Sequence, residues 1–86
     1  MNVENINKEH AKWSVDVDGN NIRLENNATR MELYVNDKLQ DLTPTLYIRD
    51  RLTGKLPDGK EIKVVISGIF RWHIHIFVDN ELVFKL

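Results

Sequence analysis

Apolar and polar residues alternate along most of the chain from Trp13 onward. In the segment WSVDV, Trp13, Val15 and Val17 share one phase, and Ser14 and Asp16 share the other. The same period of two recurs in the segments IRLE, MELYV, EIKVVISG, WHIHIFV and LVFKL. Because successive side chains of a strand point to opposite faces of a sheet, this pattern predicts half-buried β-strands. No segment shows a convincing helical period of about 3.6 residues.

Short turn segments separate these predicted strands. DGNN, NDK, PDGK and DNE are rich in glycine, asparagine and aspartate, which tolerate the positive φ angles of tight turns. LYVNDKLQ and IFVDNELV repeat one pattern, and VDVDGNNI is a looser copy. Each copy predicts one hairpin, which cannot bury its apolar face alone. We therefore expect an all-β, antiparallel β-sandwich, or a small partly open barrel, of seven to eight strands built from repeated hairpins.

The start of the chain differs from the rest. Residues 1–11 are polar and aperiodic, so they predict a flexible N-terminal tail. Residues 12–86 predict a single β domain, because 86 residues leave no room for a second core. Around Gly68 the pattern allows either a hairpin connection or one long strand with a bulge.

Composition narrows the classes of function. A hydrophobic fraction of 42% and a charged fraction of 29% predict a folded protein. A net charge of −1 gives no global electrostatic reason to bind nucleic acid or an anionic membrane. The chain has no cysteine, no apolar signal-peptide segment and no apolar run of about 18 residues. These features predict a cytoplasmic protein without disulfides or a membrane span.

Two of the three histidines, His73 and His75, are separated by one isoleucine in the segment RWHIHIFVDN. On a strand both imidazoles project from one face, about 6–7 Å apart, which suits two ligands of one metal ion. A further ligand would have to come from His10 or from a carboxylate such as Asp58, Glu61, Asp79 or Glu81. The simpler interpretation places both histidines on the solvent face of a half-buried strand. We therefore expect no metal or other cofactor, and a small metal-binding β domain is the alternative function.

Signals of catalysis and of nucleotide binding are weak. Ser14 and Ser67 fit outward strand positions without a nucleophile motif, and GKLPDGK lacks the spacing of a phosphate-binding loop. We therefore predict that the chain is not an enzyme and has no small-molecule substrate. A second alternative is single-stranded nucleic-acid binding, which small β-barrels perform through aromatic residues on a basic face. Its candidate residues are Arg49, Arg51, Lys55, Lys60, Lys63 and Arg71, with Tyr47, Phe70, Trp72 and Phe77.

The closing segment LVFKL predicts a strand at a sheet edge. An exposed edge rich in valine, leucine and phenylalanine can pair with a strand of another molecule. Val65, Phe77 and Val83, if they point outward, form an apolar contact surface beside that edge. The sequence thus favours a non-catalytic binding or structural module that contacts a protein partner, or a second copy of itself, through the edge strand.

A family resemblance supports this interpretation. WSVDVDGNNIRLE followed by RMELYVNDK resembles the opening of a domain in the Fas apoptotic inhibitory molecule family, where a tryptophan-led strand, a glycine turn and a YVDGK-like hairpin follow in that order. PDGKEIKVVISG and HIHIFVDNELV resemble that family's closing strands. The resemblance covers most of Trp13 to Val83 and implies a non-enzymatic β-sandwich that acts through protein contacts. The chain differs from the family in its single short domain and its lack of cysteine.

Overall fold

The computed structural model describes residues 1–9, 11–27, 29–44, 51–68 and 73–86. Within these ranges the chain forms nine strands and no helix. The strands are β1 (Val3–Glu9), β2 (Lys12–Val17), β3 (Asn20–Asn26), β4 (Arg30–Val35), β5 (Lys38–Pro44), β6 (Arg51–Lys55), β7 (Glu61–Ser67), β8 (His73–Val78) and β9 (Glu81–Lys85). Every pair of neighbouring strands is antiparallel. The prediction of an all-β antiparallel fold is confirmed.

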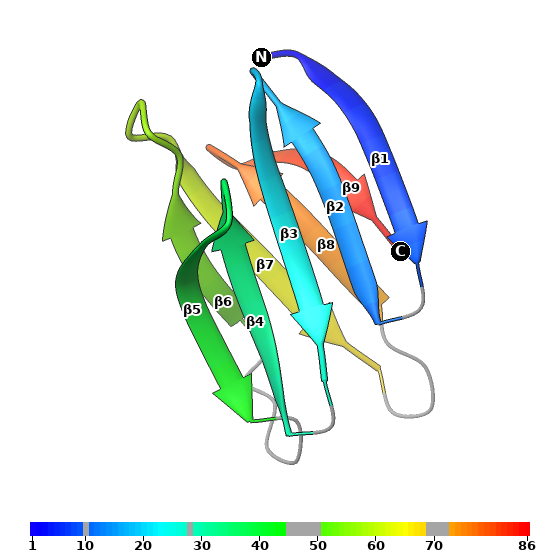
Figure 1. Ribbon diagram of the computed structural model, residues 1–86. Coiled ribbons are helices and arrows are strands. Elements are labelled where there is room, and N and C mark those ends of the chain that lie inside the picture. Colours follow the sequence, from blue (N-terminus) through cyan, green and yellow to red (C-terminus); the bar gives the residue numbers. More distant parts are fainter. Residues whose placement is uncertain (10, 28, 45–50, 69–72) are drawn as a thin grey trace.

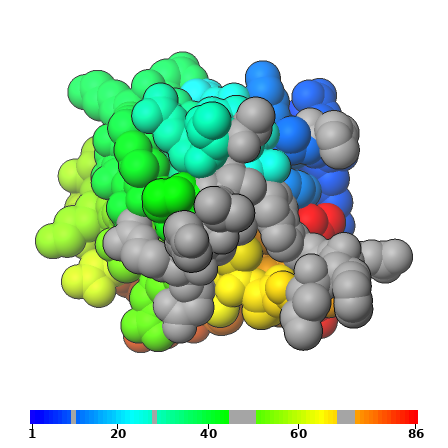
Figure 2. Space-filling view, turned by 90° about the horizontal axis from the view of Figure 1, so that it is seen from below, coloured from blue at the N-terminus to red at the C-terminus, as the bar shows by residue number. Residues whose placement is uncertain are grey.

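The strands form two stacked sheets in which strand order follows chain order (Figure 1). Strands β1 to β5 form a five-stranded sheet, and β6 to β9 form a four-stranded sheet. Seen from below, the first half of the chain makes one layer and the second half makes the other (Figure 2). β2 contacts β9 across the interface, and β4 and β5 contact β6. The arrangement is compatible with a sandwich or an open barrel and is not a closed barrel.

Alternate residues of both sheets point into the space between the layers and form an apolar core. In β2 the buried side chains are Trp13, Val15 and Val17, as the alternation predicted. Burying one such aliphatic side chain contributes about 1.5–3 kcal/mol. The core therefore holds the two sheets together. Its largest fully buried side chains include Ile22, Leu24, Met31, Leu33, Leu52, Ile62, Ile74 and Ile76.

Two-residue turns join the strands of the repeated hairpins. Asp18–Gly19, Asn36–Asp37 and Asp79–Asn80 have positive φ at both positions, between 47° and 78°. This conformation defines a type I′ turn, whose twist matches that of the strands it connects. The internal sequence repeat therefore corresponds to three hairpins, β2–β3, β4–β5 and β8–β9.

Side chains of β5 close one side of the sandwich against β6. Asp41 accepts a hydrogen bond of 3.0 Å from the backbone N–H of Thr53, and Gln40 accepts one of 3.3 Å from that of Lys55. Gly54 lies between these two donors, and a Cβ atom there would approach the Cβ of Gln40 to 3.0 Å. Glycine thus permits the close approach of the two strands. Along this stretch β6 is not an open sheet edge.

The first strand corrects the sequence prediction. β1 pairs with β2, whereas residues 1–11 were predicted to be a flexible tail and the fold to have seven to eight strands. A register shift between Val3 and Ile6 marks a β-bulge. Because of this bulge the two residues are three positions apart, yet they pair with Val17 and Val15 on one face of the sheet. The bulge removes the period of two by which the other strands were predicted.

Candidate functional site

The predicted histidine pair lies on the outer face of the four-stranded sheet. His73 and His75 alternate with buried isoleucines in β8, as predicted. His73 is exposed, and His75 is half-buried with its ring centroid 6.4 Å from that of Phe77. No three histidine, aspartate or glutamate side chains among the described residues form a group that could hold a metal ion. His10 lies outside the described residues.

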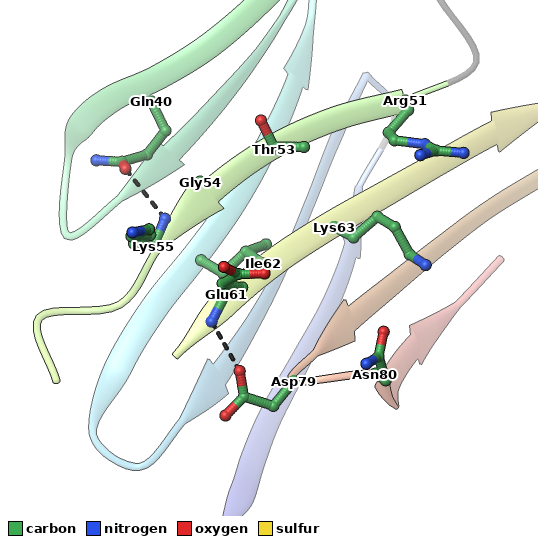
Figure 3. Close-up of a pocket in the computed structure, with 10 residues that line it drawn as sticks. All are labelled: Gln40, Arg51, Thr53, Gly54, Lys55, Glu61, Ile62, Lys63, Asp79 and Asn80. Atoms are coloured by element: carbon green, nitrogen blue, oxygen red, sulfur yellow. Dashed lines mark hydrogen bonds between the residues drawn. The ribbon is translucent and has the colours of Figure 1, made fainter. Parts of the chain in front are cut away.

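An open groove of about 810 Å³ crosses β6 and β7 on the side of the β8–β9 turn (Figure 3). Arg51, Lys55 and Lys63 line it together with Glu61 and Asp79. Asp79 accepts a hydrogen bond of 2.9 Å from the backbone N–H of Glu61, so its carboxylate fixes the turn against β7. The described lining of the groove therefore carries charges of both signs and does not select a phosphate backbone by charge alone.

The surface proposed for nucleic acid is described only in part. Phe77 is half-buried, and the Nζ of Lys63 lies 5.2 Å from the centroid of its ring. His75 stacks against the same ring. Phe77 is thus packed into the surface of the sheet, unlike an aromatic side chain that offers its face to a base. Five of the other candidates lie outside the described residues: Arg49, Arg71, Tyr47, Phe70 and Trp72.

The predicted apolar contact surface needs one correction. Val65 and Phe77 occupy outward positions and are half-buried, but Val83 is only 7% exposed. A β-bulge in β9 places Val83 and Phe84 side by side in the core. The same bulge brings Leu82 opposite Phe77, where 47% of its surface is exposed. Leu82 therefore takes the outward position that was predicted for Val83.

Among the described residues, no strand covers the side of the sandwich away from β5 and β6, which is called the open side below. There β1 ends the five-stranded sheet and β9 ends the four-stranded sheet (Figures 1 and 2). Val3 and Ile6 pair with Val17 and Val15, which are fully buried, so all four side chains face the other sheet. Nevertheless 37% of Val3 and 54% of Ile6 is exposed. The four-stranded sheet therefore lacks a strand beneath β1.

The backbone of β9 borders this open side. Leu86 donates its N–H to the carbonyl of Ile74 in β8, at 2.8 Å. Because N–H groups alternate in direction along a strand, the N–H of Lys85 points away from β8. At the far end of β1, the Nζ of Lys8 reaches to 5.8 Å from the centroid of the Phe84 ring. The open side thus combines exposed apolar side chains of β1 with the outer backbone edge of β9, which pairs with no other strand in the described part of the chain.

Two aspartates attach the N-terminal strand to β2. Asn2 donates its backbone N–H to Oδ1 of Asp18 at 2.6 Å, and Asn5 donates its side-chain amide to Oδ2 of Asp16 at 3.0 Å. The bond from Asn2 lowers the pKa of Asp18 below its ordinary value. Hydrogen bonds from Asn21 and then Asn5 lower the pKa of Asp16. Both carboxylates are therefore ionised at neutral pH, in the state that accepts these bonds.

The open side was not predicted from the sequence. Val3 and Ile6 were assigned to a tail, and Val83 was considered for the outward position that Leu82 occupies. The sequence offered one signal for β1: the two apolar residues of VENINKE lie three positions apart, as they do when a strand contains a bulge. That spacing is too short to distinguish a bulged strand from an irregular tail.

No helix able to cross a membrane is present in the segments that the structure describes. Comparison with known proteins gives no relative: no protein-family model, no curated protein and no solved structure matches the chain.

Proposed function

We propose that the chain is a non-catalytic protein-binding module that accepts an extended segment as an additional strand beside β9. The observation that carries this proposal is the exposure of Val3 and Ile6 on the inward face of β1. A strand added to β9 would lie beneath β1 and cover both side chains. In this mode of recognition, main-chain hydrogen bonds give affinity and alternate side chains give specificity.

The other sheet edges fit this role less well. β6 is bonded to the side chains of Gln40 and Asp41 along the stretch nearest β5. A strand added to the outer edge of β1 would extend the sheet that already projects, so Val3 and Ile6 would stay uncovered. Extension at β9 is the addition that buries exposed apolar surface.

The sequence supports the same class of function. The resemblance of Trp13 to Val83 to a domain of the Fas apoptotic inhibitory molecule family implies a β-sandwich that acts through protein contacts. As part of this proposal we predict that the chain belongs to that family, that it is cytoplasmic and that it has no enzymatic activity.

A peptide titration tests the proposal. The probe is a synthetic peptide of about nine residues in which valine and threonine alternate, a pattern and length typical of one strand. It is added to isotopically labelled protein at low micromolar concentration, and the binding site is mapped by NMR. We expect shifts in the backbone amides of β9 and in the methyl groups of Val3 and Ile6. Shifts confined to the groove over β6 and β7, or no binding at about 1 mM peptide, would refute the proposal.

A pair of variants at Lys85 serves as the control. Lys85→Pro removes the N–H that points away from β8, and proline is tolerated at such positions of edge strands. Lys85→Thr removes the same charge but keeps the N–H. We expect Lys85→Pro to abolish peptide binding and Lys85→Thr to retain it, with both spectra showing the native fold.

A further inference from the structure

We propose that the extended segment accepted beside β9 carries an acidic residue near its N-terminal end, and that Lys8 is the residue that selects it. This inference rests on the proposed function, because it names the chemistry of the partner at the same edge. Its starting observation is a cation on the inward face of β1. Lys8 pairs with Trp13, which is buried in the core, so the lysine side chain faces the other sheet.

The ammonium group of Lys8 lies at the open side of the sandwich. Its Nζ is 5.8 Å from the centroid of the ring of Phe84, a buried residue of β9. No ion pair within the described part of the chain includes Lys8. Because an ammonium group can donate three hydrogen bonds, Lys8 can bind an acceptor that a partner supplies beside Phe84.

The neighbouring charges of β1 and β9 do not compete for this position. Glu9 follows Lys8 in the strand, so its side chain points to the outer face of the sheet. Lys85 pairs with His75 on the outer face of β8. Glu81 begins β9 and therefore lies at the other end of that strand. Of the charged residues described in these two strands, Lys8 is the one that faces inward where β9 ends.

An added strand would bring one of its inward side chains beneath Lys8. β2 contacts β9 across the core, so β1 projects over the strand that would follow β9. Facing sheets lie about 10 Å apart, a gap that a lysine and a glutamate side chain can span together. A carboxylate at this position would accept a charge-assisted hydrogen bond from the ammonium group. An apolar side chain there would bury the cation without a partner, which is unfavourable.

Strand direction sets the order of residues in the partner. β1 and β9 point the same way along the open side (Figure 1). A strand that pairs antiparallel with β9, as all neighbouring strands of the described chain do, runs opposite to β1 as well. From its N-terminus it meets Lys8 first, then Ile6 and then Val3, all of which face inward. The partner sequence is therefore an acidic residue followed by apolar residues at alternate positions.

Three versions of the alternating peptide test the charge and its place in the sequence. Each has valine at the even positions, threonine at the odd positions and blocked ends, so that terminal charges do not contribute. Glutamate replaces the second residue in the first peptide, and glutamine replaces it in the second. In the third peptide glutamate replaces the eighth residue. We expect the first peptide to bind about tenfold more tightly than the second, and the third to bind no more tightly than the second.

Variants of Lys8 identify the selecting group. Lys8→Gln should bind the first two peptides with equal affinity, and Lys8→Glu should prefer a peptide with lysine as its second residue. Lys12→Gln is the matched control, because Lys12 precedes the inward Trp13 and so lies on the outer face at the same end of the sheet. It should keep the preference for glutamate. Both lysines are exposed, so all three variants should keep the native NMR spectrum.

The outcomes separate this inference from the proposed function. Equal affinity of the wild type for the first two peptides overturns the inference, and so does a preference for glutamate that survives in Lys8→Gln. A preference for glutamate at the eighth position overturns the direction of the added strand. If all peptides bind at β9 with equal affinity, the proposed function stands and only this inference fails. If none binds at about 1 mM peptide, both fail.

Discussion

Asp18 connects three parts of the molecule. It opens the β2–β3 turn with a φ of 52°, a conformation that aspartate tolerates better than most residues. Its carboxylate accepts the N–H of Asn2 at 2.6 Å and lies 3.5 Å from the Nζ of Lys60, in the connection between β6 and β7. One side chain thus links the N-terminal strand, a hairpin turn and the second sheet. That carboxylate therefore contributes to the attachment of β1, beside the pairing of β1 with β2.

The attachment of β1 should depend on pH. The pKa of Asp18 is lowered from 3.8 in the folded chain, chiefly by the hydrogen bond from Asn2. A carboxyl group whose pKa is lowered by folding stabilises the native state above its unfolded pKa, and that contribution disappears as the pH falls through the lower, folded pKa. We therefore expect the attachment of the first residues of β1 to be complete at neutral pH and to weaken as the pH falls below 3.8. Cα chemical shifts of Val3 and Ile6 should move toward random-coil values in that range.

Asp18→Asn is the control for this titration. The amide oxygen of asparagine can still accept the N–H of Asn2, but it does not titrate. In this variant most of the pH-dependent change in the Cα chemical shifts of Val3 and Ile6 should vanish. Any change that remains is due to the titration of Asp16. A wild-type β1 that keeps its strand shifts well below pH 3.8 would show that the carboxylates do not hold it.

At the scale of the elements, the strands that could be predicted from the sequence differ from the others in the regularity of their pairing. The pairs β2–β3 and β7–β8 contain no register shift, and their four strands keep the period of two, so the sequence predicted them. The pairs β1–β2, β4–β5 and β8–β9 each contain a shift that falls at an outer strand of a sheet. There apolar residues lie three apart, as in Val3 and Ile6, or adjacent, as in Val83 and Phe84. Whether a bulge forms depends on the neighbouring strand, which the local sequence does not identify.

Because its strands take part in bulged pairs, the candidate site was harder to predict from the sequence than the core. The hairpin turns could be predicted because asparagine, aspartate and glycine act locally. The outward phase of His73 and His75 followed from the regular alternation of β8. The open side, in contrast, is built from β1 and β9, both of which take part in bulged pairs. Its exposed residues appear only when the two sheets are placed against each other.

Two isoleucines allow a matched comparison of buried and open positions. Ile22 is fully buried in β3, whereas Ile6 is 54% exposed in β1, and both face the space between the sheets. Ile22→Ala should lower the free energy of unfolding by about 2–5 kcal/mol, because it leaves a cavity in the core. Ile6→Ala should lower it by about 0.5 kcal/mol or less in the single chain.

Denaturant unfolding at low micromolar concentration measures both values. Repeating the Ile6→Ala measurement with the alternating peptide bound beside β9 should reveal a larger loss, because the side chain is then buried. An equal, large loss for Ile6→Ala and Ile22→Ala at low concentration would mean that β1 is already covered within one chain.

At the scale of the whole molecule, the two sides of the sandwich have different properties. β5 and β6 are joined by hydrogen bonds from the side chains of Gln40 and Asp41, so that side is closed. On the other side β1 projects past β9 and exposes Val3 and Ile6. An exposed apolar surface beside an unpaired strand edge is a site of association. The fold thus has one side suited to binding.

Peptide affinity measured for three proteins tests this central claim most directly. They are the wild type, Ile6→Lys, which places a charge on the inward face of β1, and Asn7→Lys, which places the same charge on the outward face of that strand. Both residues are exposed in the free chain, so both variants should keep the native NMR spectrum. We predict that Ile6→Lys weakens binding of the alternating peptide at β9 by about tenfold or more, whereas Asn7→Lys leaves the affinity unchanged. Equal affinities for all three proteins would contradict the account.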